Sequence, residues 1–188
     1  MIPRIVAVGA SLGGLDATQL LLAALPASFP CPLVIVQHRL PEVDGRLVEL
    51  LNARSAMPVV EPDDKETIEP GHVYVAPPNY HLIVEAGFFS LSVDAPVLFA
   101  RPSIDVLFES MADSYGAHGV AVMLTGSNDD GAVGARAVKG AGGRVVVQNP
   151  ETAKAPAAPR AVLAAITPDA VLPLEWIAGH LKMMCGLG

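Results

Sequence analysis

Short runs of β-branched residues alternate with segments of helical character along this chain, and that alternation constrains the fold more than any other feature. Continuous apolar runs of this length indicate strands that are buried on both faces. Four such strands are predicted, at Ile5–Val8, Leu33–Gln37, Val120–Leu124 and Arg144–Gln148. Strands separated by helices predict an α/β fold of the doubly wound class, with a mostly parallel sheet and helices on both of its faces.

Helical patterns fill the intervals between these strands. The most regular one has Ser103 as its N-cap and an apolar stripe formed by Ile104, Leu107, Phe108, Met111 and Tyr115. Further helices are predicted at Leu15–Leu25, Leu47–Asn52, Ala132–Ala141, Pro159–Ile166 and Glu175–Met184, with shorter strands at Val59–Pro62 and Ala170–Leu172. A chain of 188 residues can bury one sizeable core, which predicts a single domain over residues 1–188.

The middle of the chain departs from the α/β alternation. Three short strand candidates, separated by turns rather than helices, lie at His72–Ala76, His81–Val84 and Phe88–Val93. This arrangement predicts a small antiparallel β-meander inserted into the parallel fold. His72 and His81 are interpreted as ordinary strand-end residues, because their spacing has no metal-ligand geometry.

Composition and charge exclude several classes of function. The net charge of −7 repels phosphate backbones, so a nucleic-acid partner is not expected. No apolar run approaches the roughly 20 residues that span a bilayer. No secretory leader is recognised, so we expect a cytoplasmic protein without membrane insertion. Cys31 and Cys185 are predicted to be packed thiols, and no metal or organic cofactor is implied.

Polar residues directly follow three of the predicted buried strands. The three loops are residues 9–14 (Gly-Ala-Ser-Leu-Gly-Gly), 37–39 (Gln-His-Arg) and 125–131 (Thr-Gly-Ser-Asn-Asp-Asp-Gly). In an open parallel sheet, functional residues gather at the carboxyl edge of the strands. We therefore expect these loops to form one site.

The first loop fits the Gly-x-Ser-x-Gly pattern between a strand and a helix, which indicates that Ser11 is a nucleophile. Its glycines permit a tight turn that projects the Ser11 hydroxyl away from the sheet. The amides of Leu12 and Gly13, at the start of the next helix, are candidate donors to a developing oxyanion. The alternatives are a phosphate or nucleotide cradle, or a simple tight turn. The absence of Gly-x-Gly-x-x-Gly and Gly-Lys-Ser/Thr motifs disfavours the cofactor alternative.

A serine hydroxyl needs a base, and His38 ends the neighbouring strand candidate. Histidine suits proton transfer at neutral pH, although His38 can also be read as a polar cap on the strand end. Asp129 and Asp130 follow the strand at Val120–Leu124, and either of them can orient the base or cap the next helix. The order Ser, His, Asp differs from that of α/β-hydrolases, which predicts a separate hydrolase fold with the same chemistry.

Five motifs together resemble the catalytic domain of the chemotaxis methylesterase family, CheB. They are Gly-Ala-Ser-x-Gly-Gly at 9–14, Val-Gln-His at 36–38, Gly-His-Val-Tyr-Val-Ala-Pro at 71–77, Arg-Pro-Ser-Ile-Asp-Val-Leu-Phe at 101–108 and Leu-Thr-Gly-Ser-Asn-Asp-Asp-Gly-Ala at 124–132. The resemblance implies a serine hydrolase that removes methyl esters from glutamate side chains of chemoreceptors and releases methanol. The implied partners are the cytoplasmic helices of methyl-accepting chemoreceptors, and some family members also deamidate receptor glutamines.

The resemblance also implies a catalytic triad. In it, Ser11 is the nucleophile and His38 is the base. The family's aspartate directly precedes Gly-Ala, which selects Asp130 over Asp129.

Other positions near the expected substrate face are also implied by the resemblance. The backbone amide of Ser127, where the family usually has methionine, is a further oxyanion donor. Arg101 lies in the family's Arg-Pro-Ser stretch near the site and is a candidate substrate-binding residue. The chain departs from the family where Leu12 replaces threonine, where residues 39–46 lack the usual methionine and Phe-Thr pattern, and where Ala-Ala-Pro-Arg replaces Gly-Met-Pro-Arg at 157–160.

Members of the family commonly carry an N-terminal receiver domain, whereas the catalytic motifs here begin in the first residues. The chain is then either a fragment or a stand-alone member with a separate receiver or kinase partner. Two rival functions stay open: a non-catalytic docking or signalling module that keeps the fold, and an esterase or deamidase for another signalling protein.

Overall fold

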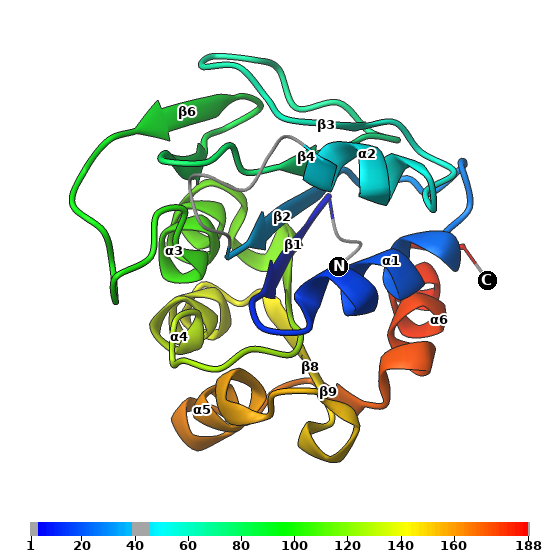
Figure 1. Cartoon of the computed structure of the whole chain (residues 1–188), viewed down its shortest axis with the longest axis vertical. Helices are drawn as coiled ribbons and strands as arrows, with labels where there is room; N and C mark the ends of the chain where they lie inside the picture. The colour runs from blue at the N-terminus through cyan, green and yellow to red at the C-terminus, as the bar shows by residue number, and fades with distance from the viewer. Residues whose placement is uncertain (1–3, 39–45, 188) are drawn as a thin grey trace.

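The computed structural model describes residues 4–38 and 46–187, which form a seven-stranded parallel sheet between two layers of helices (Figure 1). The strand order is β3-β4-β2-β1-β7-β8-β9, and all neighbouring strands are parallel. These strands are β1 (Ile5–Ala10), β2 (Leu33–Gln37), β3 (Val59–Val60), β4 (Val73–Val75), β7 (Gly119–Met123), β8 (Arg144–Gln148) and β9 (Ala170–Leu172). The predicted doubly wound α/β fold is confirmed.

Helices cover both faces of the sheet. One face carries α1 (Gly14–Ala23), α2 (Arg46–Asn52) and α6 (Leu174–Met184), and the other carries α3 (Ile104–Tyr115), α4 (Ala132–Gly140) and α5 (Ala157–Ala165). Short 3-10 helices occupy Gly116–His118 and Pro150–Thr152. The predicted helices agree with these bounds to within two residues. Helix α5 begins before Pro159, which therefore stands in its first turn, where a missing N–H removes no helical hydrogen bond.

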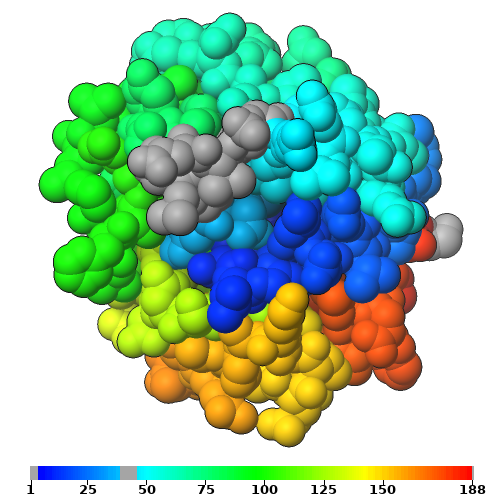
Figure 2. Space-filling model, viewed as in Figure 1, coloured from blue at the N-terminus to red at the C-terminus, as the bar shows by residue number. Residues whose placement is uncertain are grey.

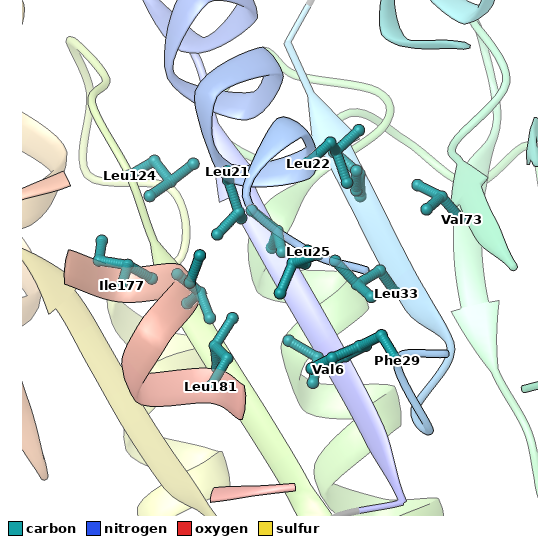
Figure 3. Packing of buried hydrophobic residues seen from close by; sticks show 14 of the residues in the cluster. Val6, Leu21, Leu22, Leu25, Phe29, Leu33, Val73, Leu124, Ile177 and Leu181 are labelled. Carbon is teal, nitrogen blue, oxygen red and sulfur yellow. The ribbon is translucent and has the colours of Figure 1, made fainter. Parts of the chain in front are cut away.

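Two hydrophobic clusters, one on each face of the sheet, form the core. Alternate side chains of β1 divide between them: Val6 and Val8 pack with α1 and α6, whereas Ile5 and Ala7 pack with α3 and α4. Figure 3 shows the first cluster, in which Leu21 of α1 and Leu25, which follows α1, lie beside Leu181 of α6 over the sheet. Burial on both faces explains why the strands read as continuous apolar runs, and each fully buried Val, Leu or Ile contributes about 1.5–3 kcal/mol.

The predicted meander is wrong in one of its three strands. β4, within the predicted strand at His72–Ala76, pairs in parallel with β2 and β3 and so belongs to the main sheet. Only β5 (His81–Val84) and β6 (Phe89–Ser92) are antiparallel to each other. The physical reason is burial: Val73 and Val75 face one cluster while Tyr74 faces the other, so this short strand is covered on both faces.

The two cysteines lie together in the folded chain although they are far apart in sequence. Cys31 and Cys185 are buried thiols that form no disulfide with each other, as predicted for packed thiols, and their side chains are hydrogen-bonded. That hydrogen bond and burial raise the pKa of the Cys31 thiol. Among the described residues, no helix combines the length and the apolar character that crossing a membrane requires.

Candidate active site

The three polar loops meet at the carboxyl edge of the sheet because β1 lies between β2 and β7. Ser11 directly follows β1 and His38 directly follows β2. Backbone hydrogen bonds join the loops: the Ser11 amide donates to the Thr125 carbonyl at 2.9 Å, and the His38 amide donates to the Ala10 carbonyl at 3.0 Å. Strands β2, β3 and β4 lie on one side of β1, and β7, β8 and β9 lie on the other. The boundary between β1 and β7 is therefore a topological switch point, where doubly wound folds form their sites.

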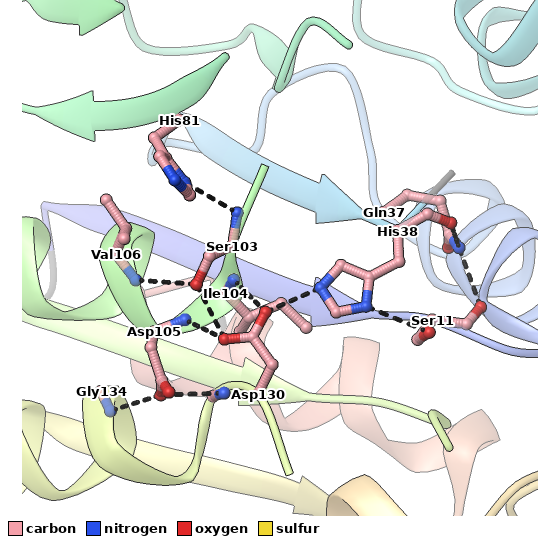
Figure 4. Close-up of polar contacts among 11 residues, drawn as sticks. Ser11, Gln37, His38, His81, Ser103, Ile104, Asp105, Val106, Asp130 and Gly134 are labelled. Atoms are coloured by element: carbon pink, nitrogen blue, oxygen red, sulfur yellow. Dashed lines mark hydrogen bonds and ion pairs between the residues drawn. The ribbon is translucent and has the colours of Figure 1, made fainter. Parts of the chain in front are cut away.

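Ser11, His38 and Asp130 are in contact at this edge (Figure 4). His38 Nδ1 lies 3.2 Å from Ser11 Oγ, and His38 Nε2 lies 2.7 Å from Asp130 Oδ2. An ionised carboxylate can only accept, so Nε2 carries the proton and Nδ1 is left as the acceptor for the serine hydroxyl. Asp129, by contrast, is exposed, and its carbonyl closes the turn before α4 by accepting from the Ala132 amide.

Asp130 is fully buried and is held at the N-terminus of α3. Its Oδ1 accepts from Ser103 Oγ at 2.8 Å and from the Asp105 amide at 2.9 Å, while Oδ2 accepts from the Ile104 amide at 2.7 Å. Burial acts to raise the pKa of Asp130, but the hydrogen bonds from His38 and from these α3 groups outweigh it and leave the pKa below its ordinary value. The carboxylate is therefore kept ionised and fixed in position beside His38.

Asp105 is a second buried carboxylate that the sequence analysis did not identify. Its Oδ1 accepts from the Gly131 amide at 2.8 Å and from the Gly134 amide at 2.7 Å, so it caps α4 just as Asp130 caps α3. Burial, together with the negative charge of Asp130, raises the pKa of Asp105 to about 6. Asp130, just before α4, thus caps α3, and Asp105 of α3 caps α4. These two contacts fix the loop that carries Asp130.

His81 supports the same network from β5. It is buried, and its Nδ1 accepts from the Ser103 amide at 3.2 Å, since an amide can only donate. Nε2 must then carry the proton, and it donates to the Ala95 carbonyl at 3.2 Å. The interpretation of His81 as an ordinary strand-end residue is incomplete, because this contact depends on how β5 packs against α3 and no local sequence pattern signals it.

The hydroxyl of Ser11 opens into a cleft of about 760 Å³, lined by Leu12, Gly13, His38, Ser127 and Lys154 among others. The amides of Leu12, Gly13 and Ser127 donate no backbone hydrogen bond to another described residue, so they stay available at the cleft. Gly13 has φ of 79°, a conformation that glycine adopts without steric cost. A Cβ at Gly126 would lie 3.1 Å from the Ser11 Cβ, so glycine there lets the third loop approach the serine closely.

Arg101 lies outside the residues that line the cleft. Its guanidinium donates to the carbonyls of Val93 and Asp94 at 2.8 and 3.0 Å, closing the base of the loop between β6 and α3. Arg39 and the divergent segment at 39–45 fall outside the described residues. Among the described residues, no cluster of three His, Cys, Asp or Glu side chains has an arrangement that would hold a metal ion.

The raised pKa of Asp105 predicts a pH-dependent stability that an Asp105→Asn variant loses. A carboxyl whose folded-state pKa is about 6, against an ordinary value of 3.8, stabilises the fold when protonated. That stabilisation, on the order of 3 kcal/mol, is lost as the pH rises from about 4 to about 6. The asparagine keeps the Oδ1 acceptor but does not titrate. In urea unfolding, the free energy of unfolding of the variant, relative to that of the original chain, is therefore expected to rise as the pH increases from about 4 to about 6. A difference that does not change with pH would contradict the raised pKa of Asp105.

A serine, a histidine and a buried carboxylate in contact at the edge of an α/β sheet form the arrangement that serine hydrolases use. A family model described as CheB methylesterase matches residues 6–181 of this chain. The chain belongs to the CheB methylesterase family.

Individual relatives agree with this assignment. A protein of Leptospira interrogans is 44% identical over 174 residues, covering 92% of this chain and 90% of that protein. Protein-glutamate methylesterase/protein-glutamine glutaminase 3 of Burkholderia thailandensis is 44% identical over 97% of this chain, which spans 52% of that relative's length. The crystal structure of the Thermotoga maritima CheB methylesterase catalytic domain matches with a TM-score of 0.93 at 34% identity, covering 98% of this chain and 100% of that one.

Proposed function

We propose that this chain hydrolyses methyl esters of glutamate side chains in a signalling protein, with Ser11 as nucleophile, His38 as base and Asp130 as the group that orients the base. The observation that carries the proposal is the contact of His38 with both Ser11 and Asp130, at 3.2 and 2.7 Å. The names of the relatives support the choice of ester. We treat the chain as one catalytic domain.

The proposed reaction begins when Ser11 Oγ attacks the ester carbonyl and its proton passes to His38 Nδ1. Asp130, ionised and 2.7 Å from Nε2, stabilises the imidazolium that forms. The carbonyl oxygen becomes an oxyanion, for which the amides of Leu12, Gly13 and Ser127 are the candidate donors. When the tetrahedral intermediate collapses, the methoxide leaves as methanol with the proton from Nδ1. Water, activated by His38 in the same way, then hydrolyses the acyl-serine and frees the glutamate.

Glutamine deamidation is a second activity of the same site. The acyl group is identical, and the leaving group is ammonia in place of methanol. Names of several relatives combine a methylesterase with a glutaminase. Because an amide nitrogen must be protonated before it leaves, the deamidation depends even more strongly on proton transfer from His38.

The proposed substrate is the helical cytoplasmic region of methyl-accepting chemoreceptors, which places the protein in the cytoplasm. Leu12, at the mouth of the cleft, is exposed and differs from the residue that the family usually has there. Ser127 is exposed in the same cleft. These two side chains are positioned to contact the segment that flanks the esterified glutamate.

The proposal is tested by methanol release from a receptor cytoplasmic fragment that carries methyl-labelled glutamates, with ammonia release from its glutamine form measured in parallel. The chain is expected to release methanol, and Ser11→Ala is expected to abolish the release. Hydrolysis of p-nitrophenyl acetate without methanol release from the receptor would instead favour an esterase for another signalling protein. The absence of both activities would favour a non-catalytic docking module.

A further inference from the structure

The loop between β6 and α3 contains a tight turn. Its two central residues are unfavourable for the backbone conformation that they adopt, and their apolar side chains are exposed to solvent. Val97 and Ala100 exchange backbone hydrogen bonds at 3.0 and 2.8 Å, with Leu98 and Phe99 between them. Both turn residues have positive φ, 47° and 65°, a conformation that turns of this kind assign to Asn and Gly. For bulky side chains such a backbone is unfavourable.

The same turn exposes these two side chains to solvent. Phe99 is 103% exposed and gains nothing from packing within the chain, and Leu98, at 50% exposed, is only half covered. Neither the backbone nor the core of this protein explains an aromatic and an aliphatic residue at these positions. A partner that covers them does explain the choice, because large exposed apolar side chains at a loop tip are suited to burial in an interface.

The base of this loop is fixed to the residues that hold Asp130. Arg101 binds the carbonyls of Val93 and Asp94, and His81 binds the Ala95 carbonyl on one side and the Ser103 amide on the other. Ser103 in turn donates to Asp130 at 2.8 Å. The tip, defined here as Leu98 and Phe99, is thus held at a set position relative to the triad.

The tip also appears on the same face of the molecule as the residues that line the cleft (Figure 2). Phe99 precedes Ser103 by four residues, a span of at most about 14 Å. The loop descends past α3 on one side of the molecule (Figure 1), and its green segment appears on the same face as the blue segment that carries residues 10–14 (Figure 2). A substrate helix extends by about 5.4 Å with each turn away from the cleft, so a helix of several turns can extend from the cleft toward the tip.

We propose that Leu98 and Phe99 form a docking contact for the protein substrate, and that they pack against aliphatic side chains on the helix that carries the esterified glutamate. This inference rests on the proposed function. A glutamate side chain is short, so its helix must come close to the mouth of the cleft, and residues one or more turns away then touch the rim. A methyl ester carries no charge, so aliphatic side chains can lie beside the esterified glutamate on the same face of its helix.

The test replaces the tip by the residues that its turn prefers, Leu98→Asn together with Phe99→Gly. These changes suit the positive φ values, so the Tm is expected to stay the same or to rise. The KM for methanol release from the methylated receptor fragment is expected to increase at least tenfold, with kcat and the rate on p-nitrophenyl acetate within twofold. A matched control is Trp176→Ser, which removes a 65% exposed aromatic from α6, on the other side of the view in Figure 1.

Several outcomes would overturn the inference. A receptor KM within twofold of the original, or an equal increase in Trp176→Ser, would show that the tip makes no specific contact. An equal loss on p-nitrophenyl acetate would assign the loop a role in positioning Asp130 instead. If the unaltered chain hydrolyses p-nitrophenyl acetate but releases no methanol from the receptor, the proposed function itself fails, and the docking contact fails with it.

Discussion

Replacing Ser11 by alanine is expected to lower kcat for ester hydrolysis by roughly 10⁵- to 10⁶-fold while the fold persists. The side chain is a small hydroxyl at the start of the 11–14 turn, and alanine removes only its oxygen. The backbone contacts of Ser11, from its amide to the Thr125 carbonyl and from the Gly14 amide to its carbonyl, do not involve that oxygen. The measurement is initial rate on p-nitrophenyl acetate, together with a thermal unfolding curve.

Ser127→Ala is the matched control, because it removes a second serine hydroxyl from the same cleft. Its proposed contribution is the backbone amide, which alanine retains, so the rate is expected to fall by less than about tenfold. Equal losses in Ser11→Ala and Ser127→Ala would contradict the assignment of the nucleophile.

His38→Ala is expected to lower kcat by a similar factor, roughly 10⁵- to 10⁶-fold, because the Ser11 hydroxyl loses the proton acceptor that His38 Nδ1 provides. Asp130 loses one hydrogen bond but keeps those from Ser103, Ile104 and Asp105, so the fold is expected to persist. The double variant of Ser11 and His38 is expected to be no slower than either single variant, since the two groups act in one step.

His72→Ala is the control for the histidine. Its Nδ1 contacts the Pro70 carbonyl and its ring stacks on Tyr74, and it does not line the cleft. Activity near that of the original chain is therefore expected. Partial recovery of the His38→Ala rate by added imidazole would support the role of base, whereas losses that multiply in the double variant would contradict a shared step.

The positions of Ser11 and His38 could be predicted from the sequence because each follows a continuous apolar strand. Such strands are buried in parallel sheets, and their carboxyl ends meet at one edge. The choice between Asp129 and Asp130 could not be made from spacing, since both follow the same strand. It depends on which of them reaches the N-terminus of α3, a contact between groups about 25 residues apart.

Two of the features that sequence reasoning missed arise from tertiary packing. Asp105 looks like an ordinary first-turn acid of its own helix, yet its carboxylate caps α4. His81 resembles a strand-end residue until β5 packs against α3 and brings it to Ser103. The turn at Leu98 and Phe99 could not be predicted, because its residues are unfavourable for the backbone that they adopt.

The most direct test of the central claim is to trap the acyl-enzyme. The chain is mixed with excess p-nitrophenyl acetate, quenched in acid within the first turnover, digested and mapped by mass spectrometry. An acetyl group on Ser11, present in the original chain and absent from Ser11→Ala, is the predicted result. An acetyl group on another residue at full turnover rate, or undiminished turnover by Ser11→Ala, would contradict the account.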